Sequence, residues 1–225
     1  MKVCTDACLF GALLPVKTSF FTDTANTNVL DIGTGTGLLS LMCIQRNEQV
    51  AVDAIEIDEN AAQQAKENFD ASPWAGSLNI IHTSIQDFSN NQSKKYALIF
   101  SNPPFFEDDL KSKDEQRNLA LHSTSLHLEE LFTIVKKLLD MHGLFAVLLP
   151  YYRTEQALQL GEINGLHLLQ KILVKQTPGH NYFRSILIFS QKPCKETVLE
   201  LVIKDSTNNY SKEFAALLKD FYLKL

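Results

Sequence analysis

Short apolar runs alternate along the chain with longer segments in which apolar residues recur at helical spacing. The runs are rich in Val, Ile and Leu, as strands buried on both faces of a sheet are. We predict strands at residues 28–33, 52–58, 78–85, 96–102 and 144–150. We predict helices at 37–46, 59–69 and 125–140, with Gly143 closing the last of them. This alternation indicates a parallel sheet with helices on both faces.

The C-terminal part of the chain has a different pattern. Residues 165–176 and 182–191 predict two strands separated by the turn TPGHN, and residues 196–205 predict another strand. Residues 210–225 predict a terminal amphipathic helix. Because the chain has no internal repeat and no obvious linker, we expect a single domain with a β-rich C-terminal end.

The composition is that of an ordinary soluble globular protein, with 45% hydrophobic and 21% charged residues among 225. The apolar runs are too short to span a bilayer and the chain shows no secretory leader, so we expect a cytoplasmic protein without a membrane partner. The cysteines, at positions 4, 8, 43 and 194, form no CxxC pair, and CTDAC has no nearby His. This pattern favours small reduced apolar residues over a metal site.

The net charge of −5 argues at first against a nucleic-acid partner. Residues 1–112 hold 7 Lys and Arg against 14 Asp and Glu, which gives −7. Residues 113–225 hold 14 against 12, which gives +2. The acidity therefore lies in the half that carries the glycine-rich loop, and the other half leaves room for a local basic surface.

The glycine-rich loop DIGTGTG, at residues 31–37, joins the first predicted strand to the first predicted helix. Gly33, Gly35 and Gly37 allow the backbone to turn sharply and to approach a ligand at a helix N-terminus. A dinucleotide fingerprint would place its third glycine at position 38, where Leu38 stands. The spacing therefore argues against a dinucleotide oxidoreductase.

Acidic residues surround this loop. Glu56 ends the second strand, where a carboxylate can accept both ribose hydroxyls of an adenosine-containing ligand. Asp31 adds a second acid, and two carboxylates suit the cationic S-adenosylmethionine better than the pyrophosphate of NAD. Asp87, just after the third strand, could accept a hydrogen bond from the adenine amino group. A plain solvated strand end is the open alternative for each of these acids.

The fourth strand ends in the stiff tip NPPF, residues 102–105, at the same carboxyl edge as the glycine loop. The Asn102 side-chain oxygen and the Pro103 carbonyl could each accept one N–H of an exocyclic amine, which would aim the nitrogen lone pair at a methyl donor. Phe105 could stack on a planar substrate. A proline-stiffened loop with packing phenylalanines is the alternative, and the glycine loop in the same sheet argues against it.

Together, the GxGxG loop, the acid that ends the second strand and the NPP[FY] tip resemble the class I amino-methyltransferases. Within that class, MKVCTDACLFGALLP, SPWA, SNPPFF and NYSKEFAALLKDFYLKL resemble the bacterial family that methylates N6 of adenosine 37 in a valine tRNA. The resemblance implies an α/β fold with a Rossmann-like, seven-stranded, mostly parallel sheet and an antiparallel C-terminal hairpin. It divides the expected domain, 1–225, into a cofactor-closing segment (1–27), a cofactor-binding core (28–150) and a β-rich part with a terminal helix (151–225).

The resemblance also implies the ligands. S-adenosylmethionine would be the cofactor, S-adenosylhomocysteine the product and the anticodon loop of valine tRNA the partner of a monomeric enzyme without a metal. The residues expected to close over or hold the cofactor are Thr5, Asp6, Asp31, Gly33, Gly35, Gly37, Glu56 and Asp87. Those expected to hold the target adenine are the catalytic Asn102, Pro103 and Phe105, with Pro104, Phe106, Arg117 and His122 on the substrate side.

The sequence departs from the family at three positions. Cys4 and Ala7 replace glycines, and Leu121 stands where the family typically has Arg. The departure at Leu121 weakens the expectation of an RNA contact at that point.

Three other functions stay open at this stage. A release-factor glutamine-N5 methyltransferase shares the NPP tip but usually has Tyr at the position of Phe105 and a helical N-terminal domain. A guanine-N2 rRNA methyltransferase also has NPPF but is usually longer, with a duplicated domain. A non-catalytic cofactor-binding subunit belongs to another class, and the intact tip beside an intact glycine loop argues against it.

Overall fold

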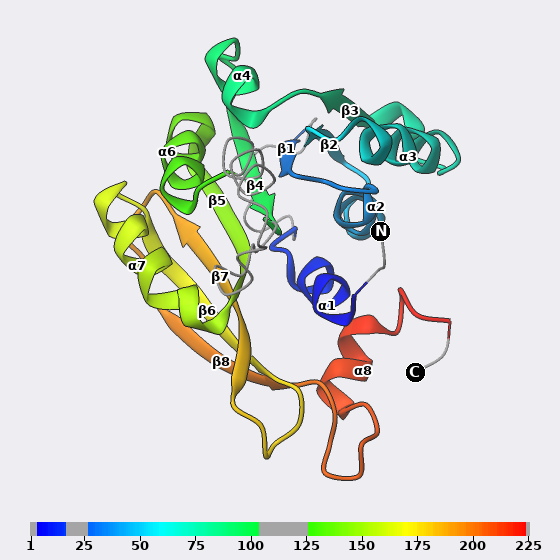
Figure 1. The fold of residues 1–225 in the computed structure, drawn as a ribbon, viewed down its shortest axis with the longest axis vertical. Helices are drawn as coiled ribbons and strands as arrows, with labels where there is room; N and C mark the ends of the chain where they lie inside the picture. The colour runs from blue at the N-terminus through cyan, green and yellow to red at the C-terminus, as the bar shows by residue number, and fades with distance from the viewer. Residues whose placement is uncertain (1–3, 17–26, 104–125, 224–225) are drawn as a thin grey trace, which may run out of the picture.

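The computed structural model describes residues 4–16, 27–103 and 126–223. One sheet of eight strands, in the order β3-β2-β1-β4-β5-β7-β6-β8, runs through it (Figure 1). The strands are β1 (Thr27–Ile32), β2 (Val50–Glu56), β3 (Leu78–His82), β4 (Tyr96–Ser101), β5 (Leu139–Pro150), β6 (His167–Lys175), β7 (Tyr182–Ser190) and β8 (Thr197–Val202). The described helices are α1 (Thr5–Leu13), α2 (Leu38–Arg46), α3 (Glu59–Asp70), α4 (Ile85–Asn90), α6 (Leu128–Leu138), α7 (Thr154–Ile163) and α8 (Lys212–Leu218), with 3-10 turns η2 (Ala75–Ser77) and η3 (Tyr151–Arg153).

The pairing of the strands confirms the predicted α/β class. β1 lies between β2 and β4 and is parallel to both, so the direction of winding reverses there. In open α/β sheets, ligands bind outside the carboxyl ends of the strands at such a switch point. β7 is antiparallel to both β5 and β6, as the predicted C-terminal hairpin requires. The sheet has eight strands rather than seven because β8 adds to β6 at the edge.

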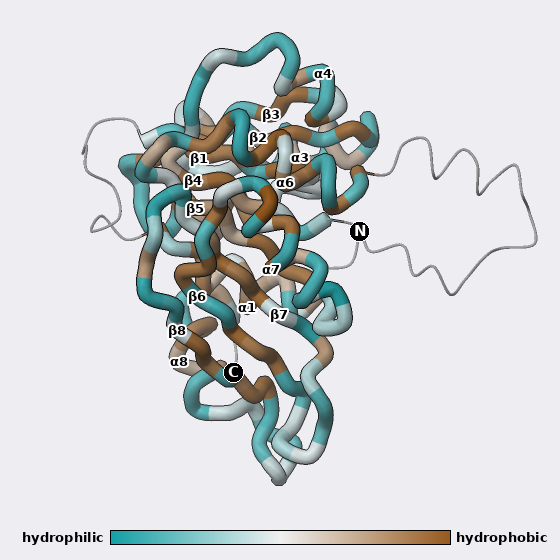
Figure 2. Tube along the Cα trace, turned by 90° about the vertical axis from the view of Figure 1, so that its left-hand side faces the viewer, coloured by the Kyte–Doolittle hydropathy of each residue, from teal (hydrophilic) through white to brown (hydrophobic). Residues whose placement is uncertain are grey.

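Two apolar layers cover the two faces of the sheet. Successive residues of a strand point into different layers: in β1, Val29 belongs to one layer and Leu30 to the other. One layer is completed by α1, α2, α3 and α8, and the other by α4, α6 and α7 (Figure 1). Figure 2 shows the hydrophobic stretches along the central strands and the hydrophilic ones at the loops around them. None of the described helices is long and apolar enough to cross a membrane.

Several predicted boundaries were wrong. The helix predicted at 125–140 ends at Leu138, and Gly143 lies inside β5 instead of closing that helix. A Cβ on Gly143 would come within 2.9 Å of the Tyr96 carbonyl oxygen, so a glycine is needed where β5 passes close to β4. The third strand ends at His82 because Ser84 caps α4 immediately afterwards. The helix α7 was not predicted.

Candidate active site

A cavity of about 490 Å³ opens where β1, β2 and β4 end, at the switch point of the sheet. Its volume lies in the range of sites for small ligands. The glycine loop, the end of β2, the N-terminal turn of α4, the end of β4, the start of α1 and one residue of β7 all contribute to its wall. Six of the predicted site residues line it, namely Asp6, Gly33, Gly35, Glu56, Asn102 and Pro103.

All three glycines of the loop, Gly33, Gly35 and Gly37, have left-handed backbones, and Gly33 and Gly37 need a glycine for different reasons. Gly33 has φ +72°, lines the cavity, and a Cβ built on it would meet nothing within 4 Å. Its open side leaves the backbone accessible to a ligand. Gly37 has φ +85° at the N-cap of α2, and a Cβ there would collide with the ring of Phe69. Gly37 does not line the cavity, and its packing alone requires a glycine.

Glu56, at the end of β2, is oriented by backbone amides. Its Oε2 accepts a hydrogen bond from Gly35 N at 2.8 Å, and its Oε1 accepts from the amides of Ile57 and Asp58 at 2.9 Å each. The carboxylate is thereby fixed against the glycine loop with one lone pair remaining, on Oε2. It can still accept a ribose hydroxyl of a nucleoside there.

Asp31 is fully buried behind the glycine loop and does not line the cavity, in contrast to the direct contact expected of it. Its Oδ2 accepts hydrogen bonds from Thr34 Oγ1 at 2.6 Å and from Ser40 Oγ at 2.7 Å. Its Oδ1 has no partner among the described residues. Burial, reinforced by the charge of Glu56, raises the pKa of Asp31 to about 7 against the lowering effect of the two hydroxyls. Asp31 therefore braces the loop from behind.

An ion pair joins α1 to β7 at the cavity. Arg184 Nε donates to Asp6 Oδ2 at 2.8 Å, and both residues line the cavity although 178 positions separate them. Burial by itself raises the pKa of Asp6, but hydrogen bonds to Cys4 and Arg184 outweigh it and hold the pKa below its ordinary value. We call this pair the Asp6–Arg184 clasp.

The NPP tip begins directly after β4. Ser101 Oγ donates to the Ile32 carbonyl at 2.9 Å, which ties the end of β4 to the end of β1. Asn102 is half-buried and Pro103 is buried, and both face the cavity. The remaining predicted substrate residues, and the departure at Leu121, lie outside the described residues, so these expectations stay predictions: Pro104, Phe105, Phe106, Arg117 and His122.

Comparisons of the sequence with known proteins show the family to which the chain belongs. The model of the methyltransferase small domain matches residues 12–154. A protein of Flavobacterium psychrophilum named tRNA1(Val) (adenine(37)-N6)-methyltransferase is 39% identical over 100% of this chain and 94% of its own length. The chain belongs to this methyltransferase family.

Solved structures with low sequence identity share the class I methyltransferase fold. A predicted O-methyltransferase from Agrobacterium tumefaciens superposes with a TM-score of 0.70 at 13% identity, over 95% of each chain. A putative class I S-adenosylmethionine-dependent methyltransferase from Listeria monocytogenes superposes with a TM-score of 0.64 at 14% identity, over 98% of this chain and 70% of the other.

In this methyltransferase, two further predicted cofactor residues stand outside the cavity wall. Thr5 begins α1. Asp87 is bonded to Ser84, the N-cap of α4: Ser84 Oγ donates to Asp87 Oδ2 at 2.7 Å and accepts from Asp87 N at 3.0 Å. Ser84, and not Asp87, lines the cavity. The spacing of Ser84 and Asp87 is readable as a helix start, and that signal was overlooked.

Arg184 is a cavity-lining residue that sequence reasoning missed. The available signal was an isolated cation inside the apolar strand YFRSILIF. Cys8 and Cys43 are buried as expected, whereas Cys4 and Cys194 are exposed, and Cys4 lines the cavity. Within the described part of the chain, no group of three His, Cys, Asp or Glu residues is placed to hold a metal ion.

Proposed function

We propose that this chain transfers the methyl group of S-adenosylmethionine to N6 of adenosine 37 in the anticodon loop of tRNA1(Val). The observation that carries the proposal is that Asn102 and Pro103 line the same cavity as Gly33 and Glu56. An amine-binding tip and an adenosine-binding wall therefore share one cavity. The name of the Flavobacterium relative supports the choice of tRNA and nucleotide.

The cavity fits S-adenosylmethionine by charge. Its described wall holds two carboxylates, Asp6 and Glu56, and one cation, Arg184. The ligand offers a cationic sulfonium and ammonium, a carboxylate and a ribose with two hydroxyls. The open backbone at Gly33 gives it room to lie against the loop. When bound, S-adenosylmethionine supplies a methyl group on a positively charged sulfur.

The tip performs its role by positioning. The amine of adenine is a poor nucleophile because its lone pair is delocalised into the ring. Asn102 Oδ1 and the Pro103 carbonyl can each accept one N–H, which localises the lone pair and directs it into the cavity. The same two oxygens stabilise the positive charge that grows on nitrogen as it gains a bond. The hydrogen bond from Ser101 to Ile32 holds the tip in place for this task.

The test uses labelled S-adenosylmethionine and valine tRNA that lacks the modification. We expect label on N6 of adenosine 37, and we expect Asn102→Ala to lower kcat by about 10²–10³-fold, the usual effect of removing one electrostatic contact. The affinity for S-adenosylhomocysteine should stay within about twofold by calorimetry, since the tip is not expected to hold the cofactor. Asn91→Ala, an exposed asparagine after α4, is the matched control.

Each alternative gives a different result. Label on a release-factor glutamine or on a guanine would show that this group, and not adenosine 37, is the methyl acceptor. Cofactor binding without transfer to any of these acceptors would indicate a binding subunit. Full activity in Asn102→Ala would show that the Asn102 side chain is not needed for methyl transfer.

The proposal includes a cytoplasmic, single-domain monomer. Size-exclusion chromatography with light scattering tests the oligomeric state, and a dimer at micromolar concentration would contradict it.

A further inference from the structure

Beside the cavity, the carboxyl edge of the sheet carries two exposed tyrosines together with partly exposed aromatic and cationic side chains. Tyr151 and Tyr152 follow the last residue of β5 and are 42% and 65% exposed. Arg153 comes next, and Lys175 and Tyr182 lie at the facing ends of β6 and β7. We call these five residues the tyrosine surface.

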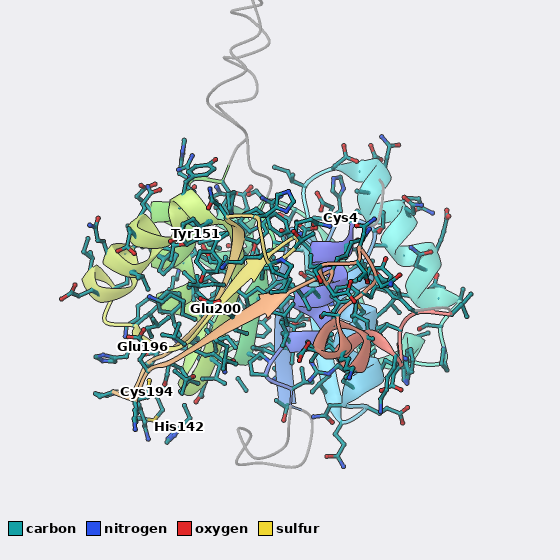
Figure 3. The ribbon with its side chains drawn as sticks, turned by 90° about the horizontal axis from the view of Figure 1, so that it is seen from below. Cys4, His142, Tyr151, Cys194, Glu196 and Glu200 are labelled. Carbon is teal, nitrogen blue, oxygen red and sulfur yellow. The ribbon has the colours of Figure 1, made fainter. Side chains whose placement is uncertain are left out.

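The register of the sheet places the tyrosine surface against the cavity. Pro150, the residue before Tyr151, pairs with Arg184 of β7, and Arg184 lines the cavity. Figure 3 shows Tyr151 and the cavity residue Cys4 on the same edge of the molecule, with His142 and Cys194 at the opposite edge. The tyrosine surface is therefore within reach of a polymer whose target group enters the cavity.

The side chains of this surface are held by one another. The rings of Tyr151 and Tyr182 have centroids 5.2 Å apart, and Lys175 Nζ lies 4.5 Å from the centroid of Tyr182. The guanidinium of Arg153 lies 5.7 Å from the ring centroid of Tyr152. The Tyr182 hydroxyl donates to Glu200, which also lies 3.9 Å from Lys175 Nζ. The rings are thus fixed in place while those of Tyr151 and Tyr152 stay accessible to a ligand.

We propose that the tyrosine surface docks the unpaired nucleotides that flank the target base, an inference that rests on the proposed function. A base that enters the cavity leaves its neighbours without a stacking partner, and exposed tyrosine rings can replace it. Arg153 and Lys175 add cations for the phosphates. In the cavity Arg184 offsets the charge of Asp6 and leaves that of Glu56, which repels phosphates, so the charge of the rim and the charge of the cavity suit different ligands.

A protein substrate fits this surface less well. Extended peptides commonly bind by adding a strand to an open sheet edge. At the tyrosine surface the strands β5, β7 and β6 are all internal, each paired on both sides. Aromatic faces with adjacent cations match bases and phosphates instead.

The test compares Tyr152→Ala with Tyr152→Phe on valine tRNA and on its isolated anticodon stem-loop. We expect Tyr152→Ala to raise KM for either RNA by about 5–150-fold, the range for loss of one stacked base. We expect kcat and the affinity for S-adenosylhomocysteine to stay within twofold. Tyr152→Phe keeps the ring and should retain the wild-type KM. Met141→Ala, a 64% exposed residue in β5 near the opposite edge, should change nothing.

A second measurement concerns the phosphates. Lys175→Ala should reduce the slope of log affinity against log salt by up to about 1, since it removes one cation. Fluorescence anisotropy of the labelled stem-loop measures this slope without any methyl transfer.

The outcomes separate the two proposals. If the wild type methylates tRNA and Tyr152→Ala has an unchanged KM, the docking inference is overturned and the proposed function stands. If the wild type methylates a release factor and not tRNA, both are overturned. If Tyr152→Ala and Tyr152→Phe raise KM equally, stacking is not the interaction, and the inference fails.

Discussion

At the scale of single residues, Asp31 supports the glycine loop without lining the cavity. The folded protein keeps its carboxyl buried behind the loop, with a pKa of about 7 in place of the ordinary 3.8. Between these values the unfolded chain loses a proton that the folded chain retains. The stability that this group contributes is therefore full below pH about 4 and is lost as the pH rises to about 7.

Asp31→Asn tests this titration. The free energy of unfolding of the wild type, relative to the variant, should fall between pH 4 and pH 7 by on the order of 4 kcal/mol and then level off. Urea unfolding over a pH series measures it. A difference between the two proteins that does not change with pH would show that Asp31 titrates normally.

Gly33 and Gly37, two of the three left-handed glycines of the loop, give a second prediction at this scale. Gly33→Ala places a methyl group in open space at the cavity, so it should weaken binding of S-adenosylhomocysteine more than tenfold while costing about 1–2 kcal/mol of stability from backbone strain. Gly37→Ala adds the collision with Phe69 and should cost about 1–3 kcal/mol more. Chemical denaturation and calorimetric titration separate the two effects.

Gly76→Ala is the control, because a Cβ there meets nothing and the residue lies outside the cavity. Equal losses of stability in Gly33→Ala and Gly37→Ala would contradict this assignment of their roles.

At the scale of elements, the Asp6–Arg184 clasp links α1 to β7. The side chains of Asp6 and Arg184 are 13% and 29% exposed, so solvent screens the pair only partly. We expect Arg184→Gln to cost about 1 kcal/mol of stability at pH 7 and to weaken binding of S-adenosylhomocysteine at least fivefold. Because the pKa of Asp6 is lowered, the contribution of the clasp should be present above pH about 4 and lost as the pH falls further.

Lys66→Gln is the matched control for the clasp. It breaks an exposed pair with Asp70 on α3, which should change stability by less than about 0.5 kcal/mol and leave binding unaltered. Equal effects of Arg184→Gln and Lys66→Gln on binding would show that the clasp does not contribute to binding of S-adenosylhomocysteine.

The elements also show which features a sequence can reveal. The strands β1, β2 and β4 and the glycine loop were predictable because apolar runs, glycines and prolines act on the backbone locally. The helix α7 was missed because its apolar face, with Ala157 and Leu160 buried, is short, and because only the 3-10 turn η3 separates it from β5. The pairing of Arg184 with Asp6 could not be predicted from the sequence, because 178 positions separate the two residues and only the fold brings them together.

At the scale of the whole molecule, the two apolar layers of the sheet should differ in their effect on the cavity. Phe214 of α8 is fully buried in the layer that contains α1, and Phe132 of α6 is fully buried in the other layer. We expect Phe214→Ala and Phe132→Ala each to cost about 3–5 kcal/mol of stability. Only Phe214→Ala should also weaken binding of S-adenosylhomocysteine, because α8 packs against the helix that carries Asp6.

Calorimetric titration at a temperature where both variants are folded measures this difference. Equal weakening in both would mean that the cavity depends on the sheet as a whole and not on α1.

The wall of the cavity contains two residues that lie 178 positions apart, and the ribosome makes them at different times. Asp6 is synthesised before β1, whereas Arg184 follows only after β1 to β6 have been translated. A nascent chain translated only through β5 already contains the glycine loop and the NPP tip, but it lacks the cation opposite Asp6. The full site therefore requires translation through β7, and shorter nascent chains have no complete pocket with which to compete for the methyl donor.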